Sequence, residues 1–342
     1  MKRFLYIIFT FMLVSCEKEI GELIEFEMSR LVVNALITAQ DDAQQIRVRA
    51  TGLHHAEKID GANVSLMLNG KEIYSHTTSR EDSLVISAKD FKEGDEITID
   101  VRKDAMHATA SAKVLPPLKI VGLDTLTVMA KRFTTSRDLE PHTQLQVKLR
   151  LADGIEPKET YYYRVSVYKN VYTLLSWSLD GDGFVDAVSY RTENDHNSFS
   201  YASDAALCES EGVNQENMSV SFDWLEGVKN TYHVFRSNYF ENGEYTLRLD
   251  FPAPFSGSQN GWAQDINVKV YAISRTEYNY LMALSAYKNL DHGTIYDTEP
   301  GITTNVVGGA GIFCVESVDS ISFHDDHKII KVGDNYYHRN DK

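Results

Sequence analysis

Short apolar runs with alternating hydrophobic and polar positions recur along most of the chain. A strand with one buried face requires this period of two, and β-branched residues are frequent in the runs. The pattern therefore predicts a mainly β protein. The predicted strands cover residues 31–37, 45–51, 63–68, 83–87, 96–102, 123–129, 144–151, 161–168, 219–222, 245–250 and 266–273.

Turn-forming residues between the runs indicate how the strands connect. Asn69-Gly70 predicts a tight hairpin, because both residues tolerate a positive φ. Pro116-Pro117 favours an extended connector, since proline cannot donate to a strand ladder. Strands at this spacing are typical of β-sandwiches, and the length of the chain favours two domains. We expect a β-sandwich over residues 30–115, a second β-rich sandwich over residues 118–323, and a polar tail over residues 324–342.

One segment of the second region has a helical period instead. Ser274 and Glu277 form a capping box, and apolar side chains then recur at helical spacing. We expect one short amphipathic helix that packs its apolar stripe against the second sheet. The stripe consists of Tyr280, Leu281, Leu284 and Tyr287.

The tyrosines near residue 162 have two interpretations. Tyr161, Tyr162 and Tyr163, followed by Tyr168, Tyr172 and Trp177, could stack on sugar rings. Alternation places Tyr161, Tyr163, Val165 and Val167 on one face, as a half-buried strand requires. The alternation favours the strand, with a glycan-binding platform as the alternative.

The N-terminal residues follow a different pattern. A basic start at Lys2-Arg3 precedes an almost wholly apolar run over residues 4–14, and a small residue precedes Cys16. These features are typical of a lipoprotein signal. The apolar run is much shorter than the roughly 20 residues that a membrane-spanning helix needs. We predict a signal peptide over residues 1–15, attachment of palmitate and related acyl chains at Cys16, and a charged tether over residues 16–29.

The charge balance is acidic. The chain has 34 Lys and Arg against 49 Asp and Glu, a net charge of −15. Removal of Lys2 and Arg3 with the signal leaves 32 basic against 49 acidic side chains, or −17. Nucleic-acid binding is therefore disfavoured, because its affinity comes largely from basic groups on phosphates.

An acidic segment of the second region is a candidate calcium site. Calcium loops place oxygen ligands at alternate positions, with glycine at the sixth. Counted from Ser178, the candidate ligands are Asp180, Asp182, the carbonyl of Phe184 and Asp186. Ser189 replaces the usual bidentate glutamate at position twelve, and Asp-Gly pairs also form good hairpin turns. The favoured interpretation is a plain hairpin, with calcium as the alternative and no other cofactor expected.

Other reactive residue types give weaker signals. Cys208 and Cys314 could form one disulfide or remain two separate thiols. His324-Asp325-Asp326-His327 resembles a metal clip, but its polar surroundings favour a solvated tail. No His-Glu-x-x-His or Gly-x-Ser-x-Gly motif occurs, so we assign no catalytic residue, and enzymatic activity stays open.

The glycine run at residues 308–311 resembles a phosphate loop only superficially. A phosphate loop has a strand before the glycines and a helix after them. Here the expected order is helix, glycines and then a strand at Ile312-Phe313. The order favours a structural role, in which glycine permits a positive φ and a close approach of backbones at the start of a strand.

The motif Asn305-x-x-Gly-Gly-x-Gly-x-Phe313, the opening strand Leu31–Ile37 and the tyrosine-rich helix together resemble a Bacteroidetes lipoprotein family, domain of unknown function 4249 (DUF4249). The resemblance spans nearly the whole mature chain. It implies an immunoglobulin-like or transthyretin-like N-terminal domain, an outer-membrane location and a place beside TonB-dependent transporters. It implies no catalytic residues.

Two short patterns also resemble signals of Bacteroidetes exported proteins. Lys18 among acidic residues directly after Cys16 resembles the signal for export to the outer face of the outer membrane. Three Asp-Ser/Thr-apolar triplets resemble O-glycosylation acceptors, at Ser83, Thr125 and Ser320.

Anchor and resemblance together predict a lipid-anchored outer-membrane protein, exposed at the cell surface, that acts by binding. We expect an accessory component of a TonB-dependent uptake system, or a capture module for its ligand. The alternatives are a surface hydrolase that acts on glycan or peptide, and a structural envelope protein or adhesin. The ligand and the oligomeric state stay open.

Overall fold

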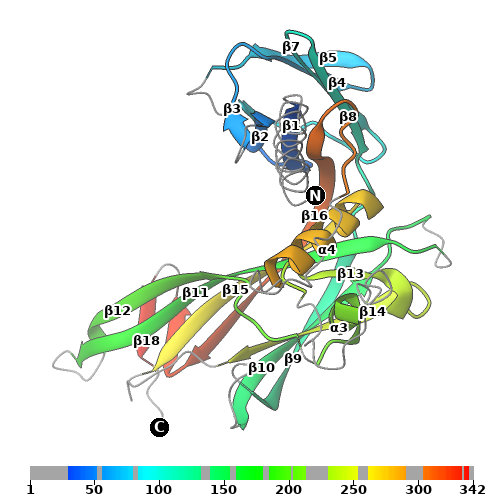
Figure 1. The fold of residues 1–342 in the computed structure, drawn as a ribbon. Helices are drawn as coiled ribbons and strands as arrows, with labels where there is room; N and C mark the ends of the chain where they lie inside the picture. Colours follow the sequence, from blue (N-terminus) through cyan, green and yellow to red (C-terminus); the bar gives the residue numbers. More distant parts are fainter. Residues whose placement is uncertain are drawn as a thin grey trace, which may run out of the picture.

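The computed structural model describes residues 30–51, 56–79, 84–131, 139–154, 159–179, 185–201, 203–212, 230–252, 261–289, 303–332 and 335–338. The protein is mainly β, as predicted (Figure 1). No helix in these ranges is both long enough and apolar enough to span a bilayer.

Most of the predicted strands are present, and several extend beyond the predicted ranges. The strands are β1 (Leu31–Thr38), β2 (Gln44–Thr51), β3 (Ala56–Lys58), β4 (Asn63–Leu68), β5 (Lys71–Thr77), β6 (Leu84–Ile86), β7 (Glu96–Lys103), β8 (Met106–Lys113), β9 (Lys119–Lys131), β10 (Leu139–Arg150), β11 (Tyr162–Leu179), β12 (Val185–His196), β13 (Val234–Arg236), β14 (Glu244–Pro252), β15 (Trp262–Ile273), β16 (Ala310–His327), β17 (Ile329–Val332) and β18 (Asn335–His338). The strand expected over residues 219–222 lies outside the described residues.

The helices are α3 (Ala205–Gly212), α4 (Arg275–Asn289) and the 3-10 turn η2 (Ser237–Tyr239). α4 is the predicted helix, and the hydroxyl of Ser274 accepts a hydrogen bond from the backbone N–H of Glu277 at 3.1 Å. Only this half of the predicted capping box forms, because the Glu277 carboxyl oxygens have no hydrogen-bond partner among the described residues. Its apolar face buries Leu281 but leaves Tyr287 exposed, so the predicted stripe is only partly correct. The expectation of one helix was wrong, because α3 was not predicted.

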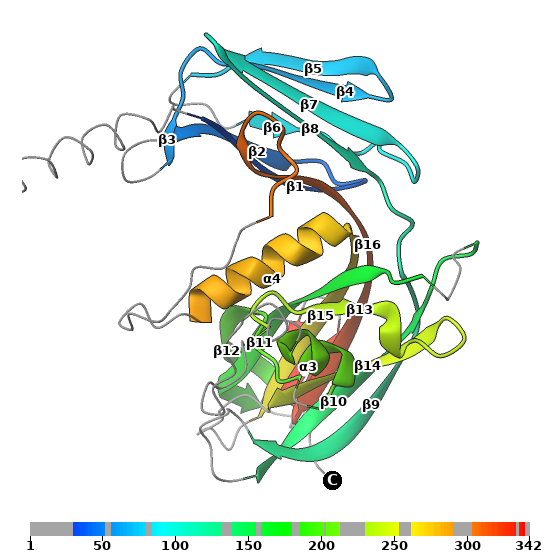
Figure 2. The same ribbon diagram turned by 45° about the vertical axis from the view of Figure 1, so that its right-hand side comes forward.

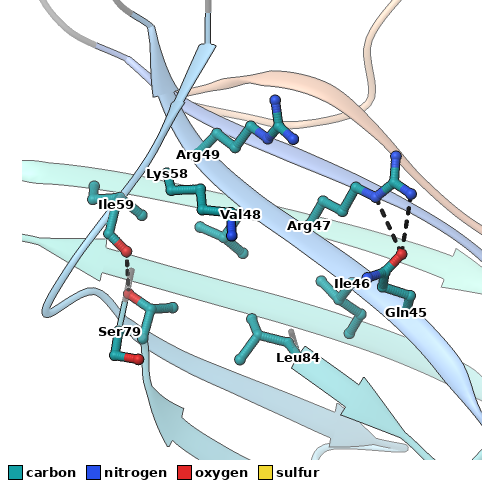
Figure 3. Close-up of a pocket in the computed structure, with 10 residues that line it drawn as sticks. Gln45, Ile46, Arg47, Val48, Arg49, Lys58, Ile59, Ser79 and Leu84 are labelled. Atoms are coloured by element: carbon teal, nitrogen blue, oxygen red, sulfur yellow. Dashed lines mark hydrogen bonds between the residues drawn. The ribbon is translucent and has the colours of Figure 1, made fainter. Parts of the chain in front are cut away.

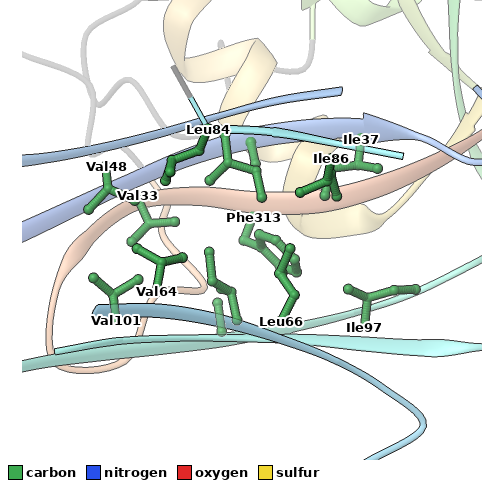
Figure 4. Close-up of a cluster of buried hydrophobic side chains, with 14 of the residues drawn as sticks. Val33, Ile37, Val48, Val64, Leu66, Leu84, Ile86, Ile97, Val101 and Phe313 are labelled. Atoms are coloured by element: carbon green, nitrogen blue, oxygen red, sulfur yellow. The ribbon is translucent and has the colours of Figure 1, made fainter. Parts of the chain in front are cut away.

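Two layers of sheet enclose the first hydrophobic core (Figure 4). One layer is formed by β1, β2, β3 and β6, together with the first part of β16. The other is the sheet β5-β4-β7-β8. Val33 and Val48 of the first layer face Val64 and Val101 of the second, and Phe313 lies between them. Alternation sets this arrangement, since every second residue of β1 is buried.

The hairpin at Asn69-Gly70 is confirmed. It joins β4 to β5, and both turn residues have positive φ, 50° at Asn69 and 79° at Gly70. These values match a type I′ turn, whose twist follows that of the two strands.

The long strand β16 belongs to both halves of the molecule (Figures 1 and 2). Residues 310–316 pair in parallel with β1, and residues 317–326 pair antiparallel with β15. Phe313 and Val315 of β16 therefore lie in the first core, as does the preceding Val306, although the sequence placed all three in the range 118–323. The division into two domains stays a prediction.

A second core lies between the sheet β14-β10-β9 and the strands β11 and β15. Tyr163, Val165 and Val167 of β11 are buried in it, as the alternation predicted. α4 packs its buried residues Tyr278 and Leu281 on a third, smaller cluster. The C-terminal range expected to be a polar tail contains the paired strands β17 and β18.

Candidate functional site

A small cleft of about 90 Å³ lies at the edge of strand β2, where two short strands leave a gap (Figure 3). β3 pairs with residues 49–51 of β2, and β6 pairs with residues 44–46. Between these stretches, Arg47 and Val48 have no ladder partner on that edge among the described strands. Ile59 and Leu84 contribute apolar walls to the cleft.

Three cationic side chains line this cleft, and none of its ten lining residues is acidic. Arg47 and Arg49 share one face of β2, two residues apart, and Lys58 extends from β3 (Figure 3). Gln45 Oε1 accepts hydrogen bonds from Nε and Nη2 of Arg47, at 3.2 and 3.1 Å. The arrangement concentrates positive charge on a protein whose net charge is −15. We name these ten residues the cation cleft.

A second group of ionisable side chains is buried where α4 meets the sheet. Arg164 of β11 binds Glu316 of β16 through both carboxylate oxygens, with Nη2 at 2.6 Å from Oε1 and 2.8 Å from Oε2. The guanidinium also lies 4.0 Å from the ring centre of Tyr271. The side chain of Glu316 is only 2% exposed. Glu316 is the last residue of β16 that pairs with β1, so this ion pair lies between the two cores.

The carboxyl group of Glu277, in the first turn of α4, joins this buried group. Its side chain is fully buried, and neither of its oxygens has a hydrogen-bond partner among the described residues. Burial raises the pKa of this carboxyl well above its ordinary value, and the negative charge of Glu316 adds to the effect. Burial likewise raises the pKa of the neighbouring Cys314 thiol, so that group stays neutral. The cluster can hold a proton on Glu277, but it is closed to solvent.

The raised pKa of Glu277 predicts a pH-dependent stability. Between the ordinary value of 4.5 and the higher folded value, the folded state binds more protons than the unfolded state, so stability falls as pH rises through this window. Glu277→Gln removes the titration and should flatten this part of the profile. Urea unfolding measured at several pH values above 4.5 tests it. A variant profile as steep as that of the parent would contradict the assignment.

A serine of β11 and a histidine at the end of β12 lie close together. The hydroxyl of Ser166 lies 2.8 Å from Nε2 of His196, a separation that suits a nucleophile and its base. Ser166 is only 1% exposed, and Asn197 Oδ1 lies 3.3 Å from the same hydroxyl. The pair therefore fastens the end of β12 to β11. No sequence motif marks it, because the two residues are adjacent only in space.

Most of the predicted site residues lie outside the described residues. These are Cys16, Ser83, Asp180, Asp182 and Phe184. Asp186 is the second residue of β12, but its side chain is not described, so the calcium loop stays a prediction. The glycosylation candidates Thr125 and Ser320 are both exposed, on β9 and β16.

The remaining candidates have structural partners. His324 and Asp325 are consecutive residues of β16; Nδ1 of His324 lies 2.7 Å from Asp265, and Asp325 accepts a hydrogen bond from Thr143. Within the described ranges, no three His, Cys, Asp or Glu side chains are grouped to hold a metal ion. Cys208 and Cys314 form no disulfide.

Tyr163 and Tyr168 lie on opposite faces of β11, as the alternation predicted. Tyr163 is buried, whereas Tyr168 is exposed and stacks on His196, with 4.5 Å between ring centres. The Tyr172 hydroxyl donates to Asp265.

Of the predicted site residues whose side chains the structure describes, Thr125 lies on β9 and Ser320 on β16. The cation cleft was missed by sequence reasoning. The signal that could have found it is the pair of basic residues at alternate positions, Arg47 and Arg49, in an acidic chain.

Comparison with known proteins adds one finding. A family model described as Domain of unknown function (DUF4249) matches residues 17–322. A search of curated proteins found no match.

Proposed function

The chain belongs to the DUF4249 family, and from this membership we propose that it is a lipid-anchored outer-membrane protein that acts as an accessory component of a TonB-dependent uptake system. Cys16 carries the acyl chains, and the folded body faces the outside of the cell. The lipoprotein signal and the Lys18 pattern support the location. The observation that carries the accessory role is an open strand edge suited to a protein partner.

That edge belongs to β9, the last strand of the sheet β14-β10-β9. Over its 13 residues, β9 pairs with β10 alone among the described strands. Between its terminal lysines, Asp124 is the single charged residue. Val121, Leu126 and Met129 are 45%, 51% and 60% exposed. A long apolar edge of this kind readily accepts another strand, and proteins usually protect such edges with charge or short length.

The sheet edges formed by β3, β5 and β8 have that protection. β3 has three residues, and β5 begins with Lys71-Glu72 and contains a register shift opposite β4. β8 is bridged by Val307 at Thr109. We therefore propose that β9 binds an extended segment of the transporter by strand addition, with backbone hydrogen bonds for affinity and alternate apolar side chains for fit.

Co-purification tests the proposal. The tagged parent protein should bring a TonB-dependent transporter with it from envelopes solubilised in gentle detergent. Leu126→Lys adds a charge to the open edge and should reduce the recovered transporter about tenfold, since a lost strand contact of about 1.4 kcal/mol corresponds to that factor. The matched control is Ile73→Lys, which places the same charge at an exposed position of β5.

Two outcomes would contradict the accessory role: a parent protein that brings no transporter, or a Leu126→Lys protein that brings as much as Ile73→Lys. Circular dichroism shows whether both variants fold. The anchor is checked in the same cells, where the parent but not Cys16→Ala should incorporate labelled palmitate.

The finer architecture is part of the proposal. Two facing sheets around one core support an immunoglobulin-like or transthyretin-like sandwich for the first domain, and the second core supports a second sandwich.

A further inference from the structure

Helix α4 lies between the two halves of the molecule, and its first turn contributes Glu277 to the buried group that also contains Arg164 and Glu316 (Figure 2). We propose that these three residues form a proton-dependent latch, which holds the first turn of α4 against the sheet while Glu277 carries a proton and releases it when the proton is lost. The latch is independent of the proposed association with a transporter, because neither the β9 edge nor the lipid anchor takes part in it.

The latch contains two buried carboxyl groups for one guanidinium. Glu316 accepts hydrogen bonds from Nε of Arg164 at 3.0 Å and from Nη2 at 2.6 and 2.8 Å. Glu277 is 0% exposed, and no described group donates a hydrogen bond to its oxygens. A proton on Glu277 leaves the three residues neutral overall, whereas its loss places one uncompensated negative charge in the interior. An unpaired buried charge is strongly unfavourable, so the closed arrangement requires the proton.

The elements packed against α4 contribute further ionisable groups. On β15, burial raises the pKa of Tyr271 to about 12, and on β16 it keeps the thiol of Cys314 neutral. On α4 itself, burial raises the pKa of the Tyr280 hydroxyl. Arg236 of β13 lies two ladder positions beyond the residue opposite Arg164. Arg164 is thus the cation that acts on the glutamate of α4, and it is shared with a second carboxylate.

The position of the latch connects its state to both halves of the molecule. Glu316 pairs with Thr38 of β1, and the next residue, Ser317, pairs with Ala272 of β15. β16 therefore passes from the first core to the second at the residue that the latch holds. α4 itself packs on β11, β13 and β16. Release of its first turn removes one of the contacts that fix the angle between the two cores, so the halves should move more freely when the latch is open.

Cys314 provides a natural reporter of the latch. Its side chain is 1% exposed, and its sulfur lies 3.6 Å from the hydroxyl of Ser274 at the start of α4. The first turn of α4 has to move before water or a reagent reaches the thiol from that side. The rate at which a thiol reagent modifies Cys314 in the folded protein therefore measures how often the latch opens.

Thiol labelling at several pH values tests the proposal. The full chain with Cys16→Ala and Cys208→Ala, here the parent, has Cys314 as its single thiol. Its labelling rate is measured between about pH 5 and pH 9 and divided by the rate for the urea-unfolded protein at the same pH, which removes the intrinsic titration of the thiol. Glu277→Gln keeps the latch neutral at every pH. The matched control, Glu72→Gln, removes an exposed carboxyl of β5.

The latched state binds one proton more than the open state, so opening becomes easier as pH rises. The labelling ratio should increase by up to about tenfold per pH unit through the folded pKa of Glu277, which lies above its ordinary value. We expect this rise in the parent and in Glu72→Gln, and a ratio constant within about twofold in Glu277→Gln. A flat ratio in the parent overturns the proposal, and so does an equal rise in Glu277→Gln.

A second reporter separates local opening from global unfolding. Ala110→Cys, combined with Cys314→Ala, places the single thiol on β8, where residue 110 is 4% exposed in the first core. Global unfolding exposes both thiols alike, whereas the latch predicts a labelling ratio at least about tenfold higher for Cys314 at the upper end of the pH range. Equal ratios would show that the proton governs global stability alone, which overturns the latch.

Hydrogen exchange gives a test that needs no substitution. After correction for the intrinsic effect of pH, the amides in the first turn of α4 should lose protection as pH rises, while those in the middle of β10 should keep theirs. Loss of protection in both elements to the same extent would contradict a local release of α4.

Discussion

Replacing Arg164 by methionine is expected to lower the free energy of unfolding by about 3 to 5 kcal/mol, because the change leaves a buried carboxylate without its partner. The side chain of Glu316 is 2% exposed, and both of its carboxylate oxygens accept hydrogen bonds from Nη2 of Arg164. Glu277 is buried in the same group, and methionine provides no positive charge near its carboxyl either. Urea unfolding at neutral pH measures the loss.

The matched control is Arg150→Met. Arg150 also binds a carboxylate, with Nη2 at 2.7 Å from Glu244, but both side chains are more than half exposed. Exposed pairs contribute about 0 to 1 kcal/mol, so this variant should stay close to the parent. The double variant Arg164→Met/Glu316→Leu should lose less than Arg164→Met alone, since it leaves no lone charge. Similar losses for Arg164→Met and Arg150→Met would refute the argument.

Local patterns were the part of the fold that the sequence predicts well. The alternation at Tyr163, Val165 and Val167 identified a buried face, because the period of a strand depends on neighbouring residues alone. The hairpin at Asn69-Gly70 and the Ser274 cap follow from the same kind of rule, since each depends on a few consecutive residues.

Rules that depend on a few consecutive residues could not predict which strands β16 pairs with. Its apolar residues indicate a strand, but nothing local shows that Ala310 pairs with Val32 while Asp319 pairs with Val270. The buried group of Arg164, Glu277 and Glu316 has the same origin, because three distant segments contribute one residue each. Charged residues in a sequence are usually assigned to the solvent, so a buried cluster is found only when the sheet order is known.

The cation cleft shows a different limit. Arg47 and Arg49 alternate with buried Ile46 and Val48, as on any strand with a solvent face. The alternation therefore places them outside but cannot show that Lys58 lies opposite Arg49. The gap between β3 and β6 depends on where two short strands end, and the ends of elements are the least predictable feature of a sequence.

The glycine at position 311 carries the second large prediction. Gly311 has a φ of +101°, which side chains rarely adopt, and an added Cβ would lie 2.1 Å from the carbonyl oxygen of Val33. That oxygen belongs to β1, the parallel partner of β16, so the two strands could not keep their present separation if residue 311 had a Cβ. Asn305 reinforces the same junction, since its side chain bonds both the N–H and the carbonyl of Phe313 at 3.0 and 2.6 Å.

Gly311→Ala is therefore expected to lower the free energy of unfolding by at least about 3 kcal/mol, the sum of backbone strain and a backbone clash. Gly70→Ala separates the two causes. Gly70 has a comparable φ of +79°, but nothing lies within 4 Å of its added Cβ, so strain alone should cost about 1 to 2 kcal/mol. Urea unfolding of the two variants measures the difference. Equal losses would mean that the contact with Val33 is not what fixes glycine at position 311.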